Sequence, residues 1–201
     1  SDEADLQDYY DKMKKAYTKI FAGCELDFRI VNADSGSIGG SGSAEFMVIS
    51  NNGEDIIVTC SETKNASNLE ACPCKDITPI ASKSLKPIKH HTPGIKKIED
   101  VAKHFKCDTK ECIKTLIYIV DDEPIAIACR GNHTINDIKV KKICGAHKVS
   151  LATEEEIHRC TGCENGYIGP YKMKKEIRVI ADNAIKGMAR MVVGGNQKDY
   201  H

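Results

Sequence analysis

The sequence of 201 residues lacks two features that would at once narrow its function, a long apolar run and a net charge. No stretch reaches the roughly 18 consecutive apolar residues that a membrane-spanning helix needs. The 29 basic and 29 acidic side chains balance, so no overall field attracts nucleic acid, and an RNA contact would need a local basic patch. We therefore expect a protein with no membrane contact and no general affinity for nucleic acids.

An export signal is also missing, because the N-terminal stretch is charged throughout: SDEADLQDYYDKMKKAY. Ten cysteines make up about 5% of the chain, a lower density than in small secreted scaffolds held by disulfides. These two observations predict a cytoplasmic protein whose thiols are reduced.

Two parts of the chain have different patterns and are separated by a proline-rich stretch. Residues 1–75 begin with apolar residues at helical spacing over residues 3–22, and the segments AEFMVIS and IIVTC then predict a hairpin. From Cys72 to Pro93 four prolines and scattered polar residues remove any period, which places a linker at residues 76–94. A second domain is expected over residues 95–201.

The second part mixes helix and strand patterns. GIKKIEDVAKHF has the apolar spacing of a helix, TLIYIV and IAIACRG flank a turn as in a hairpin, and TEEEIHRC opens with a capping threonine. Together these elements predict a mixed α/β (α+β) class, in which helices pack on a mixed β-sheet.

The glycine-rich stretch DSGSIGGSGS is not expected to bind a nucleotide phosphate. A phosphate-binding loop ends in a lysine and a serine or threonine that open a helix, whereas Ala44, Glu45 and Phe46 lead into a strand pattern here. We interpret the stretch as a flexible loop.

Two pairs of cysteines could supply four thiolates to zinc: Cys72 with Cys74, and Cys160 with Cys163. The single-residue spacing of the first pair is unusual for such a site, and that pair lies beside the linker. A redox pair of the thioredoxin type would also need a strand leading into Cys160. We expect reduced thiols and no metal, with a zinc module as an alternative.

The loop GYIGP, from Gly166 to Pro170, carries two glycines and a proline between a helix and a strand. Glycine lets a backbone approach a ligand closely, and proline fixes the direction in which the chain leaves. The same composition is typical of a plain turn, so both interpretations stay open.

Segments along nearly the whole chain follow the order of one known family. They are LDFRIVNADSGSIGGSGSAEFMV, HTPGIKKIEDVAKHF, CIKTLIYIV, CRGNHTINDIKVKKI, ATEEEI, GYIGP, VIADNAIKGM and GGNQKDYH. In these segments the chain resembles bacterial-type prolyl-tRNA synthetase, a class II enzyme whose catalytic core is interrupted by a large editing domain. The resemblance implies that residues 1–75 are a fragment of the antiparallel class II core. It also implies that residues 95–201 have the fold of the aminoacyl-tRNA deacylases, truncated at the C-terminal end.

Other parts of that family have no counterpart in the sequence. The motifs that bind ATP, proline and the acceptor end find no match, nor does the anticodon-binding domain, so we do not expect the chain to make prolyl-adenylate. Ala44 stands where many relatives have a histidine, a departure that concerns synthesis rather than editing. The resemblance implies that only the full-length synthetase, expected to be a homodimer, needs ATP and Mg. Editing would need no cofactor.

The resemblance also assigns roles to eight residues. It implies a catalytic role for Lys114, Asp182 and His201, and a substrate-binding role for Gly166, Gly169, Pro170, Ile98 and Val101. In the family these residues surround a small pocket for the aminoacyl group on the terminal adenosine of tRNA. The implied partner is proline tRNA mischarged with alanine, whose ester bond is attacked by water.

A non-catalytic module that grips the acceptor end of tRNA is the alternative to this enzyme. The stretch KVKKICGAHK would then contact phosphates, although a solvated helix face explains the same charges. The sequence has no Gly-x-Ser-x-Gly elbow, while its many cysteines and histidines leave covalent catalysis open.

Overall fold

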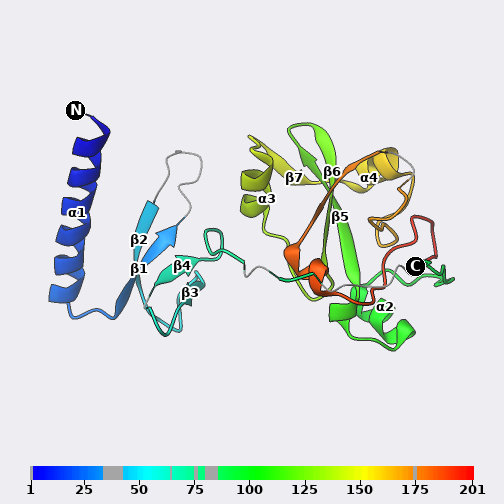
Figure 1. Ribbon diagram of the computed structural model, residues 1–201, viewed down its shortest axis with the longest axis horizontal. Coiled ribbons are helices and arrows are strands. Elements are labelled where there is room, and N and C mark those ends of the chain that lie inside the picture. The colour runs from blue at the N-terminus through cyan, green and yellow to red at the C-terminus, as the bar shows by residue number, and fades with distance from the viewer. Residues whose placement is uncertain (1, 34–42, 64, 75–76, 80–85, 174–175) are drawn as a thin grey trace. The chain divides into compact units, whose positions relative to one another are not determined.

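The computed structural model describes residues 2–33, 43–63, 65–74, 77–79, 86–173 and 176–201. The chain forms two compact units, residues 1–73 and 74–201, each of which carries its own sheet (Figure 1). The glycine-rich stretch from Asp34 to Ser43 lies outside the described residues except for its last serine.

The first unit begins with the predicted helix, α1 (Glu3–Gly23), which is confirmed. Its N-terminus is capped by the Asp2 side chain, which accepts a hydrogen bond from the Asp5 amide at 2.9 Å. One side of the helix contacts the sheet through aromatic rings, since the Phe21 ring lies 5.4 Å from that of Phe28 and 5.3 Å from that of Phe46.

Four strands form the sheet of this unit in the order β2-β1-β4-β3. They are β1 (Phe28–Ala33), β2 (Ser43–Val48), β3 (Ile57–Thr59) and β4 (Ala66–Asn68). The predicted hairpin between AEFMVIS and IIVTC is wrong, because β1 and β4 lie between β2 and β3. An alternating pattern identifies a strand but not its partner, and β1 accepts β2 on one edge and β4 on the other. The β1–β4 pair is parallel, so this sheet is mixed rather than antiparallel as expected.

The second unit has a mixed sheet in the order β7-β5-β6-β8. Its strands are β5 (Ile113–Val120), β6 (Glu123–Arg130), β7 (Val149–Leu151) and β8 (Arg178–Ala181). The hairpin of β5 and β6 is confirmed, and β8 adds in parallel to β6. Asp121 and Asp122 make the turn with positive φ angles of 45° and 68°.

Two helices pack on opposite faces of this sheet (Figure 1). Val140 of α3 (Asp137–Cys144) joins a cluster with Tyr118 and Ile127, whereas Ile157 of α4 (Glu154–Thr161) packs against Ile117. The faces alternate along β5 because successive strand residues point to opposite sides. The predicted class, a mixed sheet with helices packed on it, is therefore confirmed.

The described residues of the second unit contain one further helix and two 3₁₀ turns. They are α2 (Ile98–Phe105) and the 3₁₀ turns η2 (Thr109–Glu111) and η3 (Asn183–Gly187). A capping box opens α4, where the Thr153 side chain accepts from the Glu156 amide and the Glu156 side chain accepts from the Thr153 amide.

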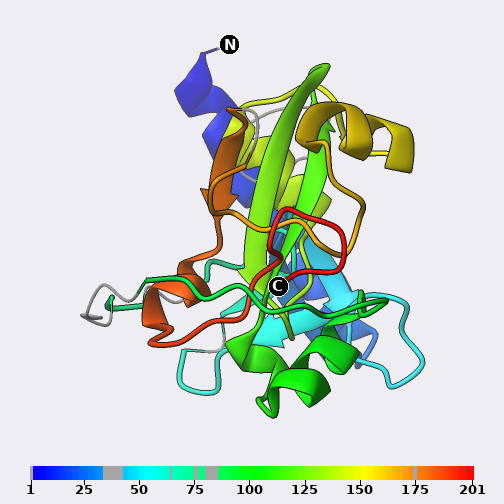
Figure 2. The ribbon, with the colours of Figure 1, turned by 90° about the vertical axis from the view of Figure 1, so that its right-hand side faces the viewer.

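The last part of the predicted linker is integral to the second unit. The amides of His90 and His201 each donate to the carbonyl of the other, at 2.8 and 3.1 Å, and Thr92 is fully buried. Figure 2 shows this segment running beside the C-terminal residues. The independent part of the linker is therefore shorter than residues 76–94.

No helix within the described part of the chain is both long enough and apolar enough to span a bilayer.

Candidate functional site

A cavity of about 260 Å³ lies at the start of β5, where several loops of the second unit converge. Ligand pockets usually measure about 300 to 1,000 Å³, so this cavity suits a small chemical group. The residues that line it are Lys96, Lys97, Ile98, Glu99, Val101, Ile113, Lys114, Thr115, Leu116, Asn165, Gly166, Ile168, Val192, Gly194 and His201.

Five of the eight residues assigned from the sequence line this cavity. They are Lys114, His201, Gly166, Ile98 and Val101. The other three, Asp182, Gly169 and Pro170, lie outside its lining.

Helix α2 supplies the apolar wall of the cavity. Ile98 and Val101 are three residues apart and so face the same side of the helix, where Val101 is only 2% exposed. Gly131 makes room for Ile98, because a Cβ atom at position 131 would come within 2.8 Å of the Ile98 Cγ1 atom. The helix ends at Phe105, and its C-cap residue, Lys106, adopts a left-handed conformation.

Lys114 is one of three lysines that line the cavity, with Lys96 and Lys97. It is the second residue of β5, opposite Cys129 of β6, and its side chain is partly exposed. Among the described residues its ammonium group forms no ion pair and no hydrogen bond. An ammonium group left unpaired at a cavity wall is available to a negatively charged or carbonyl-bearing ligand.

Asp182 lies outside the lining of the cavity, but its charge affects the pKa of Cys129, the residue opposite Lys114 on the neighbouring strand. Its carboxylate accepts a hydrogen bond from the Ala184 amide at 2.7 Å, as the cap of η3, and lies 3.8 Å from His133 Nδ1. Burial raises the pKa of the Cys129 thiol, which the charge of Lys114 lowers and that of Asp182 raises. The two charges thus flank one buried thiol.

His201 is held on both sides by its neighbours. Its Nδ1 atom lies 2.7 Å from the hydroxyl oxygen of the fully buried Thr92, and its ring packs 5.6 Å from that of Tyr167. Burial lowers the pKa of His201, partly opposed by a hydrogen bond with the Gly166 backbone, while His104 lowers it further. The imidazole is therefore neutral at pH 7 and already has partners for its polar atoms.

A buried tyrosine joins the segments that form the cavity. The Tyr167 hydroxyl donates to Asp199 Oδ1 at 2.7 Å, and the same oxygen accepts from the Gly94 amide at 2.8 Å. Burial and this carboxylate raise the pKa of Tyr167 to about 12. The sequence analysis missed Thr92, Tyr167 and Asp199, because hydrogen bonds between residues 32 to 109 positions apart leave no local signal.

The two glycines of GYIGP have different surroundings. Gly166 has a φ of +96° and lines the cavity, with Lys96 packed against it. A Cβ atom at Gly169 would overlap the carbonyl oxygen of Gly194, and the Gly169 amide donates to Asn196 Oδ1 at 2.9 Å. The close approach at Gly169 is therefore to another backbone segment rather than to a ligand.

One buried polar atom in the cavity wall has no partner. The Thr115 hydroxyl forms no hydrogen bond within the described structure, although its side chain is buried. A buried hydroxyl without a hydrogen-bond partner destabilises the folded state by about 1 to 3 kcal/mol.

The cysteine pairs show no metal site. Cys160 and Cys163 are buried in the core beside Ile157 and Tyr167. In the described parts of the chain, no group of three or more histidine, cysteine, aspartate or glutamate side chains is placed to hold a metal ion.

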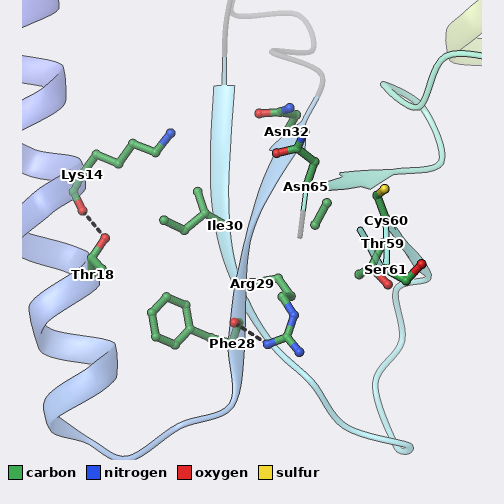
Figure 3. Close-up of a pocket in the computed structure, with 11 residues that line it drawn as sticks. Lys14, Thr18, Phe28, Arg29, Ile30, Asn32, Thr59, Cys60, Ser61 and Asn65 are labelled. Atoms are coloured by element: carbon green, nitrogen blue, oxygen red, sulfur yellow. Dashed lines mark hydrogen bonds between the residues drawn. The ribbon is translucent and has the colours of Figure 1, made fainter. Parts of the chain in front are cut away.

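A larger hollow of about 710 Å³ lies in the first unit, between α1 and the sheet (Figure 3). Lys14 and Arg29 are its charged residues, and Arg29 donates to the Asp27 carboxylate at 2.6 Å and the Phe28 carbonyl at 2.8 Å. The described residues that line it include no carboxylate and no histidine. This hollow therefore lacks the acid–base groups expected of a hydrolytic site.

Comparison with known proteins finds one family model within the second unit and relatives that match both units. The family model described as the aminoacyl-tRNA editing domain matches residues 92–201. A proline–tRNA ligase of Syntrophotalea carbinolica is 43% identical over 205 residues, covering 100% of this chain and 35% of that protein. Another, of Geobacillus sp. (strain WCH70), is 41% identical over 197 residues, covering 98% of this chain and 35% of that protein. The chain thus spans about a third of the length of these curated relatives.

A solved structure shares the fold. The crystal structure of hypothetical protein APE2540 has a TM-score of 0.50 and 21% identity, covering 56% of this chain and 76% of that one. At this identity the likeness concerns the fold alone.

The contact between Gly169 and Gly194 predicts that position 169 tolerates no side chain. Gly169→Ala should lower the free energy of unfolding by about 1 to 3 kcal/mol, because the methyl group must displace a backbone carbonyl. Denaturant unfolding would measure the loss. Gly23→Ala is the control, since nothing lies within 4 Å of a Cβ atom there. Equal stability of the Gly169→Ala chain and the wild type would show that the contact is not required.

The burial of His201 predicts a pKa below 6.5, the ordinary value, measurable by NMR titration of its ring protons. As pH falls through about 6.5, the unfolded chain takes up a proton before the folded chain does, so stability decreases until the native pKa is passed. His201→Gln should remove this part of the pH dependence. A native pKa at or above 6.5 would contradict the expected burial.

Proposed function

Because the chain belongs to the family of aminoacyl-tRNA editing domains, we propose that it hydrolyses alanine from mischarged proline tRNA at the 260 Å³ cavity. The names of the proline–tRNA ligases that it resembles support proline tRNA as the carrier. The unpaired ammonium of Lys114 in the wall of a small cavity supports the proposal most directly.

The need for such an activity follows from size. An aminoacylation site large enough for proline cannot strongly reject alanine, because each missing methylene in an apolar pocket lowers the binding free energy by only about 1 to 3 kcal/mol. A second site that admits only the smaller amino acid removes the error. Ile98 and Val101 form the wall that would admit the methyl group of alanine and exclude the pyrrolidine ring.

The reaction requires little from the protein. An aminoacyl ester is already activated, so water can attack its carbonyl carbon, the bond to the ribose oxygen breaks, and that oxygen takes a proton. The products are free alanine and uncharged tRNA. Lys114 would hold the ester and stabilise the negative charge that develops on its carbonyl oxygen. This hydrolysis needs no metal ion and no nucleotide.

His201 and Asp182 would act through other groups rather than on the ester. The imidazole is engaged by Thr92 and by the Gly166 backbone, so it positions the Gly166 loop against the cavity. Asp182 would partly offset the positive charge of Lys114, since the two residues shift the pKa of Cys129 in opposite directions. The homodimer of a full-length synthetase stays a prediction.

The role of Lys114 predicts that its ammonium is essential. The purified chain should release alanine from alanyl-tRNA(Pro) and spare prolyl-tRNA(Pro), and Lys114→Ala should lower kcat/KM for alanine release by about 100-fold or more. Lys114→Arg should be partly active, because a planar fork replaces a compact charge.

A second lysine controls for the loss of charge. Lys103 is exposed on the last turn of α2 and does not line the cavity, so Lys103→Ala should keep full activity. Circular dichroism would establish that both variants are folded. Normal deacylation by a folded Lys114→Ala chain would overturn the proposed function.

The apolar wall predicts that the preference for alanine depends on size. Ile98→Ala should enlarge the cavity and lower the ratio of kcat/KM for alanyl-tRNA over prolyl-tRNA by about tenfold. Ile143→Ala is the matched control, because Ile143 is 66% exposed and lies elsewhere. An unchanged ratio in Ile98→Ala would exclude selection by this wall.

A further inference from the structure

A second hollow of about 460 Å³ shares a wall with the cavity. Gly194 and His201 line both, so the two spaces lie on either side of the C-terminal segment. The segment beginning at Pro87 forms the other side of this hollow and runs beside the C-terminal residues (Figure 2).

We propose that this second hollow binds the terminal nucleoside of the RNA acceptor end, with its base stacked on Tyr171. The inference rests on the proposed function, in which the aminoacyl group occupies the cavity. The ester joins that group directly to the terminal ribose, so the nucleoside must lie in a space that continues from the cavity. At about 260 Å³ the cavity itself is too small to hold the aminoacyl group and the nucleoside together.

Two neighbouring hollows could receive the nucleoside, and their charges distinguish them. The alternative, of about 490 Å³, shares Lys96 and Asn165 with the cavity. Three glutamates line it, and Glu164 already holds Lys96 in an ion pair at 3.0 Å. Lys96 and Arg159 also line this hollow, so the three glutamates leave it a formal charge of −1, which disfavours a phosphate group.

The proposed hollow has the opposite character. Lys89 and Lys172 line it, and no carboxylate does so among the described residues. Lys89 donates to Gln197 Oε1 at 2.7 Å, which holds its ammonium at the rim. Both charges therefore suit the phosphate that precedes the terminal nucleoside.

An aromatic surface for the base is present in the same hollow. Tyr171 is 51% exposed, and the Lys172 ammonium lies 5.3 Å from the centre of its ring. Ile88, 76% exposed, adds a second apolar surface. Bases stack on exposed aromatic rings without sequence preference. Because the Lys172 ammonium lies over one face of the Tyr171 ring, the base would stack on the other face.

The backbone that carries Tyr171 is fixed in place. Asn196 is 9% exposed, and its side-chain amide donates to the Tyr171 carbonyl at 2.7 Å while its oxygen accepts from the Gly169 amide. The stacking surface is thus tied to the same loop that lines the cavity at Gly166. A base on Tyr171 and an aminoacyl group beside Lys114 would be held by one connected structure.

Two small esters test the inference with the full chain. One is the alanyl ester of adenosine, and the other is the alanyl ester of 1,4-anhydroribitol, which has the ribose ring but no base. The wild type should hydrolyse the adenosine ester with a kcat/KM about tenfold higher. Tyr171→Ala should lose that advantage and hydrolyse the abasic ester at the wild-type rate, while Tyr171→Phe should retain the advantage.

The control variant changes a residue of the other hollow, the one of about 490 Å³. Glu155→Ala should leave the preference for the adenosine ester unchanged, because Glu155 lines only that hollow. A preference that disappears in Glu155→Ala but persists in Tyr171→Ala would overturn the inference.

The failures of the two proposals are distinguishable. Equal hydrolysis of both esters by the wild type would overturn the nucleoside site and leave the proposed function standing, and this comparison needs no variant to fold. Hydrolysis of neither these esters nor alanyl-tRNA(Pro) would contradict the proposed function itself.

Discussion

The hydrogen bond between the buried Tyr167 hydroxyl and Asp199 is the interaction on which the site depends. It ties the helix-to-strand loop to the C-terminal segment, and the same carboxylate oxygen holds the Gly94 amide before α2. The cavity exists only where these three segments meet at the start of β5. Since Tyr167 is fully buried, removing Asp199 would leave its hydroxyl proton without this acceptor, at a cost of about 1 to 3 kcal/mol.

Local patterns predicted the elements of this fold better than their pairing. The helix over residues 3–22, the β5–β6 hairpin and the Thr153 cap could be read from spacing, because each depends on neighbours within a few residues. The partners of β2 and β3 could not, since alternation identifies a strand face and says nothing about the strand beside it. The same limit explains why the linker was drawn too long. Thr92 reads as a loop residue until Asp199 and His201 are brought against it.

The site shows a similar division between local and distant information. Lys114 was conspicuous in the sequence as a lysine at the front of an apolar strand, and its ammonium forms no ion pair or hydrogen bond with the residues that the structure describes. His201 carries no local signal, and its neutrality arises from burial against Thr92 and Tyr167. Residue chemistry therefore suggests which groups are candidates, whereas only the folded chain separates a free charge from a group already in use.

The glycines show why the cavity and the second hollow can lie so close together. Gly194 and His201 line both, and a Cβ atom at Gly194 would overlap the Ile168 carbonyl, so the backbone segments pack closely at this wall. At Gly169 the GYIGP loop likewise packs directly against the Gly194 backbone of the C-terminal segment. The ester linkage between an aminoacyl group and a ribose is short. A substrate with its aminoacyl group in the cavity and its nucleoside in the second hollow therefore needs the two spaces to lie close together. Close backbone packing at these glycines is therefore the structural condition that would let one substrate occupy both spaces.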